Sequence, residues 1–210
     1  RNIGMKNEFA CSDSLKSKTT RLKGLEVFSG SGGFTYGILS SNVVDMKWAI
    51  EYDTETARSY QINYPECFVI KQEANMFLEK IIQNQNGNSN IPKKNEVDFI
   101  LCSPPCQGFS LLNRFKDTEY SSLQNSLIFT SLSYFDFFRP KYFLIENVRN
   151  LATYENGSIT QSILRFLLDC GYQCSFAVLQ AGNFGVPQNR RRFFIWAAAP
   201  GVKLPNFPEP

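Results

Sequence analysis

The chain contains no histidine and only six cysteines among its 210 residues. Without histidine, no Cys-His or Ser-His pair can operate, so any proton transfer has to use carboxylates, arginines or water. The cysteines are too few and too scattered for a disulfide scaffold, which favours a reducing compartment. Because the spacings from Cys102 to Cys106 and from Cys170 to Cys174 do not match the usual zinc pattern, we expect no metal site.

Long hydrophobic runs and a strong net charge are also missing. The apolar stretches have the length of strands or are interrupted by polar residues, and no signal-like segment opens the chain. Solubility alone explains the net charge of +3, although three guanidinium groups gather at Arg190-Arg191-Arg192, where they suit phosphates or base edges. With 43% hydrophobic residues, the chain is expected to form one soluble domain with a substantial core.

The order of apolar segments predicts an α/β fold with a mostly parallel sheet and flanking crossover helices. Residues 1–21 are polar and begin without methionine, so we expect a flexible linker cut from a longer protein. Residues 83–90 are expected to form a surface loop. Strands are predicted at 25–28, 47–50, 67–70, 97–101, 142–145, 173–180 and 192–198, and helices at 34–39, 54–62, 127–138 and 159–170.

The most informative motif is SPPCQGFS, residues 103–110, which directly follows the apolar run 97–102. Two prolines fix the backbone torsions ahead of Cys106 and remove two amide donors, so the loop cannot extend the strand. A thiol presented in this way is typical of a nucleophile. A free cysteine is more often a small buried hydrophobe, so the motif alone leaves both interpretations open.

A glycine-rich turn, FSGSGG at residues 28–33, follows the first predicted strand and precedes the first predicted helix. Glycines allow tight turning and a close approach of the backbone to a ligand, but such turns bind nucleotides, adenosylmethionine or nothing. Glu51 ends the second strand, where a carboxylate can take both hydroxyls of an adenosine ribose. Turn and carboxylate fit dinucleotide and methyl-donor sites equally.

Glu146 follows the predicted strand 142–145 directly. Burial there should raise the pKa of its carboxyl group and keep a proton available, although a strand-end glutamate can also cap the following turn. In an open α/β sheet, ligands lie outside the carboxyl ends of the strands. The glycine-rich turn, Glu51, Cys106 and Glu146 are therefore predicted to converge on one crevice.

The order FSGSGG, Glu51, PPCQGFS, ENV and QNRRR resembles that of the DNA (cytosine-5) methyltransferases over about Leu22 to Pro210. Further segments look most like the animal maintenance-type enzyme: NRF (113–115), ENVRN (146–150), GYQC (171–174), VLQAGNFGVPQ (178–188) and AAAPGVKLPNFPEP (197–210). The resemblance implies the Rossmann-like class I methyltransferase fold, C-terminally truncated. Residues 22–210 would be the N-terminal and larger part of a catalytic domain, without its target-recognition region.

The resemblance also implies a mechanism in which Cys106 adds to C6 of a cytosine that is flipped out of the duplex. Glu146 would contact N3 and the exocyclic amine and stabilise the developing charge. Arg190 and Arg192 would steady the base and the cysteine loop, while Arg191 faces away.

The methyl donor implied by the resemblance is S-adenosyl-L-methionine. Glu51 would bind its ribose and Tyr52 would lie against its adenine. Where the maintenance-type pattern has Asp-Cys near the adenine, this chain has Glu73-Ala74, so that contact is expected to be longer or lost. The remaining residues expected around the donor are Phe28, Ser29, Gly33, Phe34, Pro104 and Leu127.

The resemblance further implies double-stranded DNA as partner, in particular hemimethylated CpG, and a nuclear location without membrane contact. Three alternatives stay open. A tRNA cytosine-5 methyltransferase shares the scaffold, but its characteristic cysteine-loop and Cys-Phe-Thr sequences are absent. A catalytically silent fragment would bind adenosylmethionine or a partner, and a nicotinamide oxidoreductase would explain the glycine-rich turn and Glu51 but leaves PPCQ without a role.

Overall fold

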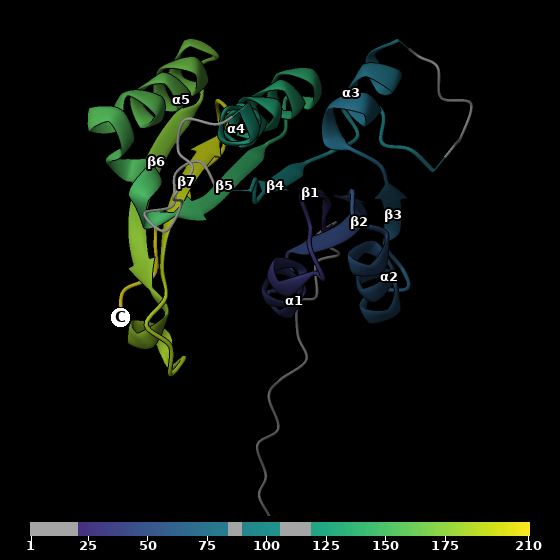
Figure 1. Ribbon diagram of the computed structural model, residues 1–210, viewed down its shortest axis with the longest axis horizontal. Coiled ribbons are helices and arrows are strands. Elements are labelled where there is room, and N and C mark those ends of the chain that lie inside the picture. The colour runs from purple at the N-terminus through teal and green to yellow at the C-terminus, as the bar shows by residue number, and fades with distance from the viewer. Residues whose placement is uncertain (1–20, 84–89, 106–118) are drawn as a thin grey trace, which may run out of the picture.

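The chain is represented by a computed structural model that describes residues 21–83, 90–105 and 119–210, with the backbone alone for 119–126. Its centre is a seven-stranded sheet in the order β3-β2-β1-β4-β5-β7-β6 (Figure 1). Strands β1 to β5 run parallel, whereas β7 is antiparallel to both β5 and β6. The strands are β1 (Leu22–Val27), β2 (Val44–Glu51), β3 (Phe68–Lys71), β4 (Phe99–Cys102), β5 (Tyr142–Val148), β6 (Gln173–Gln180) and β7 (Arg191–Ala198).

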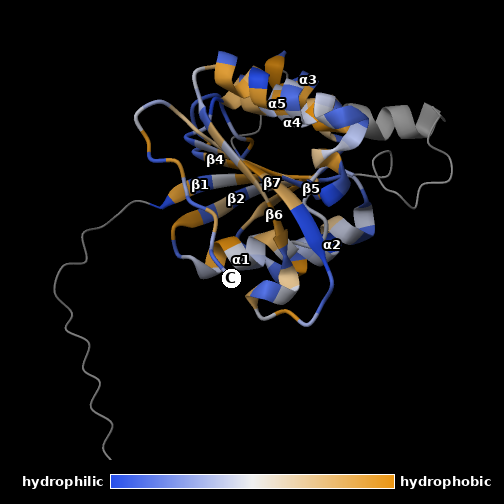
Figure 2. Cartoon of the chain, turned by 90° about the vertical axis from the view of Figure 1, so that its left-hand side faces the viewer, coloured by the Kyte–Doolittle hydropathy of each residue, from blue (hydrophilic) through white to orange (hydrophobic). Residues whose placement is uncertain are grey.

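Helices cover both faces of the sheet, which gives three layers (Figure 2). On one face lie α1 (Gly33–Ser40) and α2 (Thr54–Asn63), and on the other lie α3 (Ala74–Ile82), α4 (Glu119–Phe138) and α5 (Ser158–Asp169). Each interface has its own cluster of buried apolar side chains. Strands covered on both faces are apolar at almost every position, as in Phe99-Ile100-Leu101-Cys102 of β4. Within the described ranges, no helix is long and apolar enough to cross a membrane.

All seven predicted strands and all four predicted helices are present, with shifted ends. Strand β1 starts at Leu22 and ends at Val27, because Phe28 turns out of the extended conformation with φ of 61°. Helix α4 begins at Glu119, earlier than predicted, because its start lies outside the apolar run used to recognise it. Of the loop predicted at 83–90, residues 84–89 lie outside the described residues.

Helix α3 was not predicted, although its sequence carries a clear signal. Ala74, Phe77, Leu78 and Ile81 are buried and recur at helical spacing on one face. The carboxylate of Glu73 accepts a hydrogen bond from the backbone N–H of Met76 at 2.9 Å and caps the helix.

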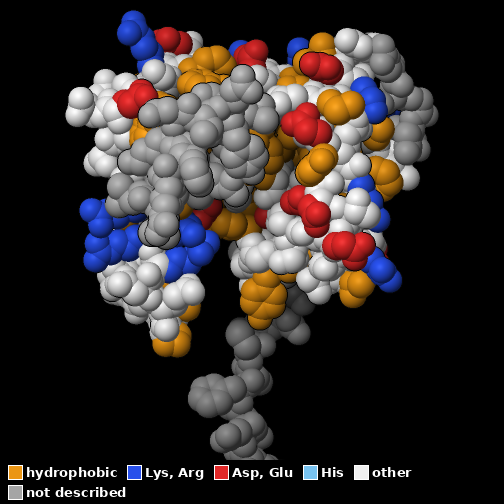
Figure 3. Space-filling model, in the orientation of Figure 1, with side chains coloured by type: hydrophobic (Ala, Val, Ile, Leu, Met, Phe, Trp, Pro, Cys, Tyr) orange, Lys and Arg blue, Asp and Glu red, His pale blue; other side chains and the backbone are white. Residues whose placement is uncertain are grey.

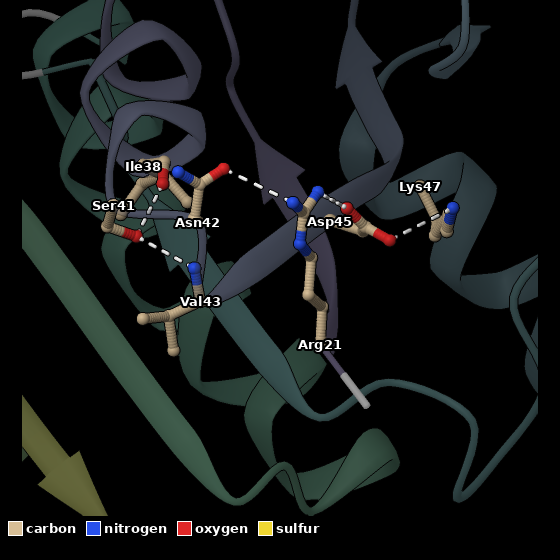
Figure 4. A network of polar contacts seen from close by, with 7 residues as sticks. All are labelled: Arg21, Ile38, Ser41, Asn42, Val43, Asp45 and Lys47. Carbon is tan, nitrogen blue, oxygen red and sulfur yellow. Dashed lines mark hydrogen bonds and ion pairs between the residues drawn. The ribbon is translucent and has the colours of Figure 1, made fainter. Parts of the chain in front are cut away.

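The start of β1 is joined to β2 by exposed polar contacts at the edge of the sheet where β1 and β2 begin (Figure 4). Arg21 donates to Asp45 at 3.1 Å and to the side-chain oxygen of Asn42 at 3.2 Å, and Lys47 lies 3.5 Å from Asp45. In the preceding turn, the Ser41 hydroxyl donates to the carbonyl of Ile38 at 2.6 Å. Exposed ion pairs contribute at most about 1 kcal/mol each, so these contacts align the strand more than they stabilise the fold.

Candidate active site

Several of the predicted site residues that the structure describes lie near the carboxyl ends of the parallel strands. Strands β1, β2, β4 and β5 are parallel, so their carboxyl ends lead to Ser29, Glu51, Pro104 and Glu146 at the same edge. Strand β7 is antiparallel and therefore begins at this edge, which brings the arginine run 190–192 to it. Cys106 lies outside the described residues, and the chain is described up to Pro105 on its N-terminal side.

The glycine-rich turn has one packed side and one open side. Gly32 has φ of 90°, and a Cβ built there would meet the Tyr64 ring at 2.2 Å. A Cβ at Gly30 or Gly33 meets nothing within 4 Å. The turn therefore packs closely against the end of α2 and presents its backbone to open space at Gly30 and Gly33.

Polar contacts hold this turn in place from two neighbouring elements. The Tyr64 hydroxyl donates to the carbonyl of Gly32 at 2.7 Å, and the Asn63 side chain donates to the carbonyl of Ser31 at 3.2 Å. From the end of β2, the Glu51 carboxylate accepts from the N–H of Gly30 at 2.8 Å and from that of Asp53 at 2.9 Å. The glutamate is thus oriented by the turn itself.

Beneath the turn lies a buried carboxyl group that sequence reasoning missed. Glu26 on β1 is 1% exposed and accepts hydrogen bonds from the hydroxyls of Thr35 and Tyr60. The thiol of Cys67 donates to the Tyr60 hydroxyl at 3.8 Å. Burial raises the pKa of Glu26 to about 7, although both hydroxyl donors act to lower it. The available signal was an acidic residue inside the apolar strand LKGLEV.

Glu146 lies within β5, two residues before its end at Val148, and does not follow the strand as predicted, because pairing with β7 extends β5 beyond Ile145. It is 9% exposed and faces two arginines of the chain segment that starts β7. Its carboxylate lies 2.8 Å from Nε of Arg192 and 4.0 Å from a guanidinium nitrogen of Arg190. Burial raises the pKa of Glu146 above its ordinary value, while the charges of Arg192 and Arg190 act to lower it. The predicted direction of the pKa shift is confirmed. Burial favours the protonated form of this carboxyl group, and the two arginines favour the charged form.

Arg191 points elsewhere, in agreement with its prediction. Its Nε donates to the side-chain oxygen of Gln180 on β6 at 2.7 Å. Figure 3 shows Lys and Arg side chains gathered over the β6 and β7 side of this face. The guanidinium of Arg192 has a second contact besides Glu146, because it donates a hydrogen bond to the carbonyl of Arg191 at 2.9 Å.

The other predicted residues occupy different environments around this edge. Phe34 on α1 is half-buried, and its ring packs edge-on against Phe194 at 6.1 Å between centroids. Tyr52 is 75% exposed, Pro104 is buried, and Leu127 on α4 is half-buried. Tyr52 is therefore the one of these four side chains that is mostly exposed.

Glu73 and Ala74 are engaged at the start of α3. Besides capping this helix, the Glu73 carboxylate accepts from the side chain of Asn75 at 3.2 Å. The side chain of Ala74 packs in the core, and its carbonyl accepts from the hydroxyl of Tyr134 at 2.7 Å. Both residues of the pair thus make hydrogen bonds that hold the start of α3.

Comparison with known proteins places the chain in a family. The family of C-5 cytosine-specific DNA methylases matches residues 22–209. The chain belongs to this family. It is 44% identical over 94% of its length to "DNA (cytosine-5)-methyltransferase PliMCI" of Paracentrotus lividus, and 44% identical over 92% to "DNA (cytosine-5)-methyltransferase 1" of Mus musculus. It spans about 12% of the length of each of these relatives.

Solved structures show the same fold. A putative DNA modification methyltransferase from a prophage of E. coli aligns with a TM-score of 0.65 and 23% identity, over 85% of this chain and 47% of that one. A DNMT2 variant of Spodoptera frugiperda aligns with a TM-score of 0.65 and 24% identity, over 86% of this chain and 51% of that one. The family and these neighbours together confirm the predicted Rossmann-like class I methyltransferase fold.

The methyl donor of this family is S-adenosylmethionine, and the residues present fit it. Ser29 is 5% exposed and its hydroxyl has no hydrogen-bond partner among the described residues; the same holds for the buried hydroxyl of Ser103. Buried polar atoms without partners are rare unless a ligand or water serves them. With the open backbone at Gly30 and Gly33 and the oriented Glu51 carboxylate, they form a polar cradle beside the turn.

Proposed function

We propose that residues 22–210 bind the methyl donor and the target base of a DNA (cytosine-5)-methyltransferase. The observation that carries this proposal is the buried Glu146 carboxyl, held by Arg192 and Arg190 at the same sheet edge as the glycine-rich turn. Burial of a carboxyl group is costly, and hydrogen bonds to a polar base would offset that cost. Family membership supports this assignment over a nicotinamide oxidoreductase.

In the proposed complex, Glu51 accepts hydrogen bonds from both ribose hydroxyls of the donor, because each carboxylate oxygen has lone pairs beyond those used by Gly30 and Asp53. The open backbone at Gly33 would allow the donor to approach the turn closely. Bound S-adenosylmethionine supplies an electrophilic methyl group. Its apolar and aromatic surroundings are assigned to Phe28, Phe34, Tyr52, Pro104 and Leu127, with Ser29 as a polar contact and Glu73 and Ala74 at the adenine end.

The proposed chemistry begins with Cys106, whose thiolate adds to C6 of the cytosine and makes C5 nucleophilic. Glu146 in its protonated form donates to N3, and the electron density gained by the ring is stabilised there. C5 would then take the methyl group as the bond between the methyl carbon and the donor sulfur breaks, which leaves the electron pair on sulfur and S-adenosylhomocysteine as product. Water removes the C5 proton, the bond between C6 and sulfur breaks, and the thiolate of Cys106 is regenerated.

The target base has to leave the duplex before this addition, because stacking covers C6. Flipping costs a few kcal/mol, which contacts in the pocket recover. Arg190 and Arg192 hold the Glu146 carboxyl and steady the base. We assign double-stranded DNA as substrate, hemimethylated CpG as its preferred site, maintenance methylation as the reaction, and the nucleus as location. The names of the animal relatives support DNA as the substrate.

The test is covalent trapping on a hemimethylated duplex that carries 5-fluorocytosine, with S-adenosylmethionine present. Fluorine at C5 blocks the final elimination, so an active enzyme stays bound through sulfur. The chain spans about 12% of its relatives, so the assay is run on the 210 residues and on a version extended with the following segment of the Paracentrotus lividus relative. We expect a denaturation-resistant complex with at least the extended version, and none in Cys106→Ser.

The alternatives predict different outcomes in the same assay. A complex with tRNA carrying 5-fluorocytosine, but not with the duplex, would show the RNA-modifying type. Donor binding without any complex, in folded protein of both versions, would show a silent binding fragment. A duplex that carries 5-fluorocytosine in one strand and an unmethylated CpG in the other, and that traps as well as the hemimethylated one, would contradict the maintenance assignment alone.

A further inference from the structure

Asn147, the residue after Glu146, makes two hydrogen bonds at the end of β5. It is 2% exposed. Its side-chain Nδ2 donates to the carbonyl of Pro104 at 3.1 Å, and its Oδ1 accepts from the N–H of Val148 at 2.9 Å. Pro104 belongs to the segment that leaves β4. One side chain thus joins the ends of two neighbouring parallel strands.

These partners require an amide rather than a carboxylate. The N–H of Val148 needs an acceptor and the carbonyl of Pro104 needs a donor, so the amide fits in one orientation only. Aspartate has the same shape but would set a carboxylate oxygen against the carbonyl oxygen of Pro104. A buried mismatch of this kind is costly, because neither oxygen regains the water it has lost.

The Pro-Pro sequence makes this donor necessary. Proline has no N–H, so Pro104 and Pro105 can be held by hydrogen bonds only through their carbonyl oxygens. The backbone N–H of Ser103 still pairs with the carbonyl of Val27 at 3.2 Å, but that contact ends the regular pairing of β4. The Asn147 amide is the next anchor along the described chain.

Consecutive strand residues point to opposite faces of a sheet, so Glu146 and Asn147 act on opposite sides of β5. On one side Glu146 meets Arg192, and on the other Asn147 meets Pro104. The end of β5 therefore fixes the position of the Glu146 carboxyl group relative to the Pro104 carbonyl.

We infer that Asn147 is a positioning residue, which acts through the Pro104 carbonyl to set where the chain enters the segment carrying Cys106. The inference rests on the proposed function, because positioning matters to a rate only if the thiolate attacks. Asn147 contacts neither the base nor the donor in the proposed complex. Its loss should slow the addition step and leave substrate binding nearly unchanged.

The test compares Asn147→Asp, Asn147→Ala and the exposed control Asn42→Asp, in whichever version of the protein traps 5-fluorocytosine DNA. Asp keeps the shape and Ala adds no charge, while the control makes the same chemical change at a site where Arg21 can pair with the new carboxylate. We expect both Asn147 variants to lose about 10- to 100-fold in kcat and in trapping rate. The KM for DNA and the Kd for S-adenosylmethionine should stay within about threefold, which also shows that the variants are folded.

Trapping by Asn147→Ala at the rate of the Asn42→Asp control would overturn the inference, as would a loss that appears in KM alone. Failure of the wild-type protein to trap DNA contradicts the proposed function instead. A readout without substrate remains in that case, namely solvent exchange of side-chain amide protons measured by NMR. The side-chain amide protons of Asn147 should exchange at least about tenfold more slowly than those of Asn42. Equal exchange rates would show that the hydrogen bond from Asn147 to Pro104 does not form in solution.

Discussion

The Nε of Arg192 lies 2.8 Å from the Glu146 carboxylate, although the two residues come from strands that run in opposite directions. In the register of β5 and β7, Arg192 stands opposite Val148, and its side chain reaches back along β5 to the glutamate. A second hydrogen bond, to the carbonyl of Arg191, keeps the guanidinium in that position. The charge that limits the pKa of the buried acid is therefore part of the sheet itself.

Removing this guanidinium should raise the pKa of Glu146 further, because burial then acts with less opposition. We expect Arg192→Gln to move the Glu146 carboxyl titration, followed by NMR, to higher pH, and to lower the methylation rate about tenfold or more. Arg191→Gln is the matched control, since Arg191 donates to Gln180 instead. An unchanged Glu146 titration in Arg192→Gln would show that the pair does not form in solution.

The second prediction concerns Glu26 and the dependence of stability on pH. Its pKa is about 7 in the folded protein and 4.5 as the ordinary value, so the unfolded chain loses this proton first as the pH rises. The free energy of unfolding should therefore fall between about pH 4.5 and pH 7, by ~3 kcal/mol in total, and level off above.

Glu26→Gln should remove this part of the pH dependence, because the amide has no proton to lose. Urea unfolding between pH 4.5 and pH 8 measures it, with Glu79→Gln on the exposed side of α3 as control. A wild-type curve that is flat over this range, or parallel curves for wild type and Glu26→Gln, would rule out the buried protonated carboxyl.

The same substitution should destabilise the protein strongly at one of two neighbouring glycines and hardly at the other. Gly32→Ala places a methyl group against the Tyr64 ring at a φ of 90°, and we expect a loss of ~2–4 kcal/mol in the free energy of unfolding. Gly33→Ala meets no neighbour within 4 Å at the first residue of α1, so stability should change by less than about 0.5 kcal/mol.

The same Gly33→Ala protein should bind S-adenosylmethionine more weakly, by about tenfold, because the methyl group enters the space assigned to the donor. Chemical denaturation and isothermal titration calorimetry on the two variants separate these effects. An unchanged affinity of Gly33→Ala for S-adenosylmethionine would show that the donor does not bind beside Gly33.

The fourth prediction tests the carboxylate at the end of β2. Glu51→Gln should weaken S-adenosylmethionine binding by about 10- to 100-fold, because a charged acceptor for the ribose hydroxyls is lost. Glu55→Gln, exposed in the first turn of α2, is the control for the change in charge. Isothermal titration calorimetry measures the affinity of both proteins for S-adenosylmethionine. Equal affinities would show that Glu51 does not bind the ribose.

Much of this architecture was predictable from local patterns. The apolar runs revealed every strand, since strands buried on both faces need apolar residues at nearly all positions. Helix α3 was missed despite its periodic Ala74, Phe77, Leu78 and Ile81, because an apolar pattern of only 9 residues is ambiguous between helix and strand. The buried Glu26 was missed because an acid inside a strand looks like a surface residue until the covering helices are known.

The family, the order of the motifs and the type of chemical group near each strand end follow from local sequence patterns alone. Tertiary structure decided which of these groups meet. The insertion of β7 against the direction of β5 brings Arg192 to Glu146, and the packing of α2 sets Tyr64 under Gly32. Strand order and direction depend on which surfaces can be buried together across the whole chain, and no local spacing contains that information.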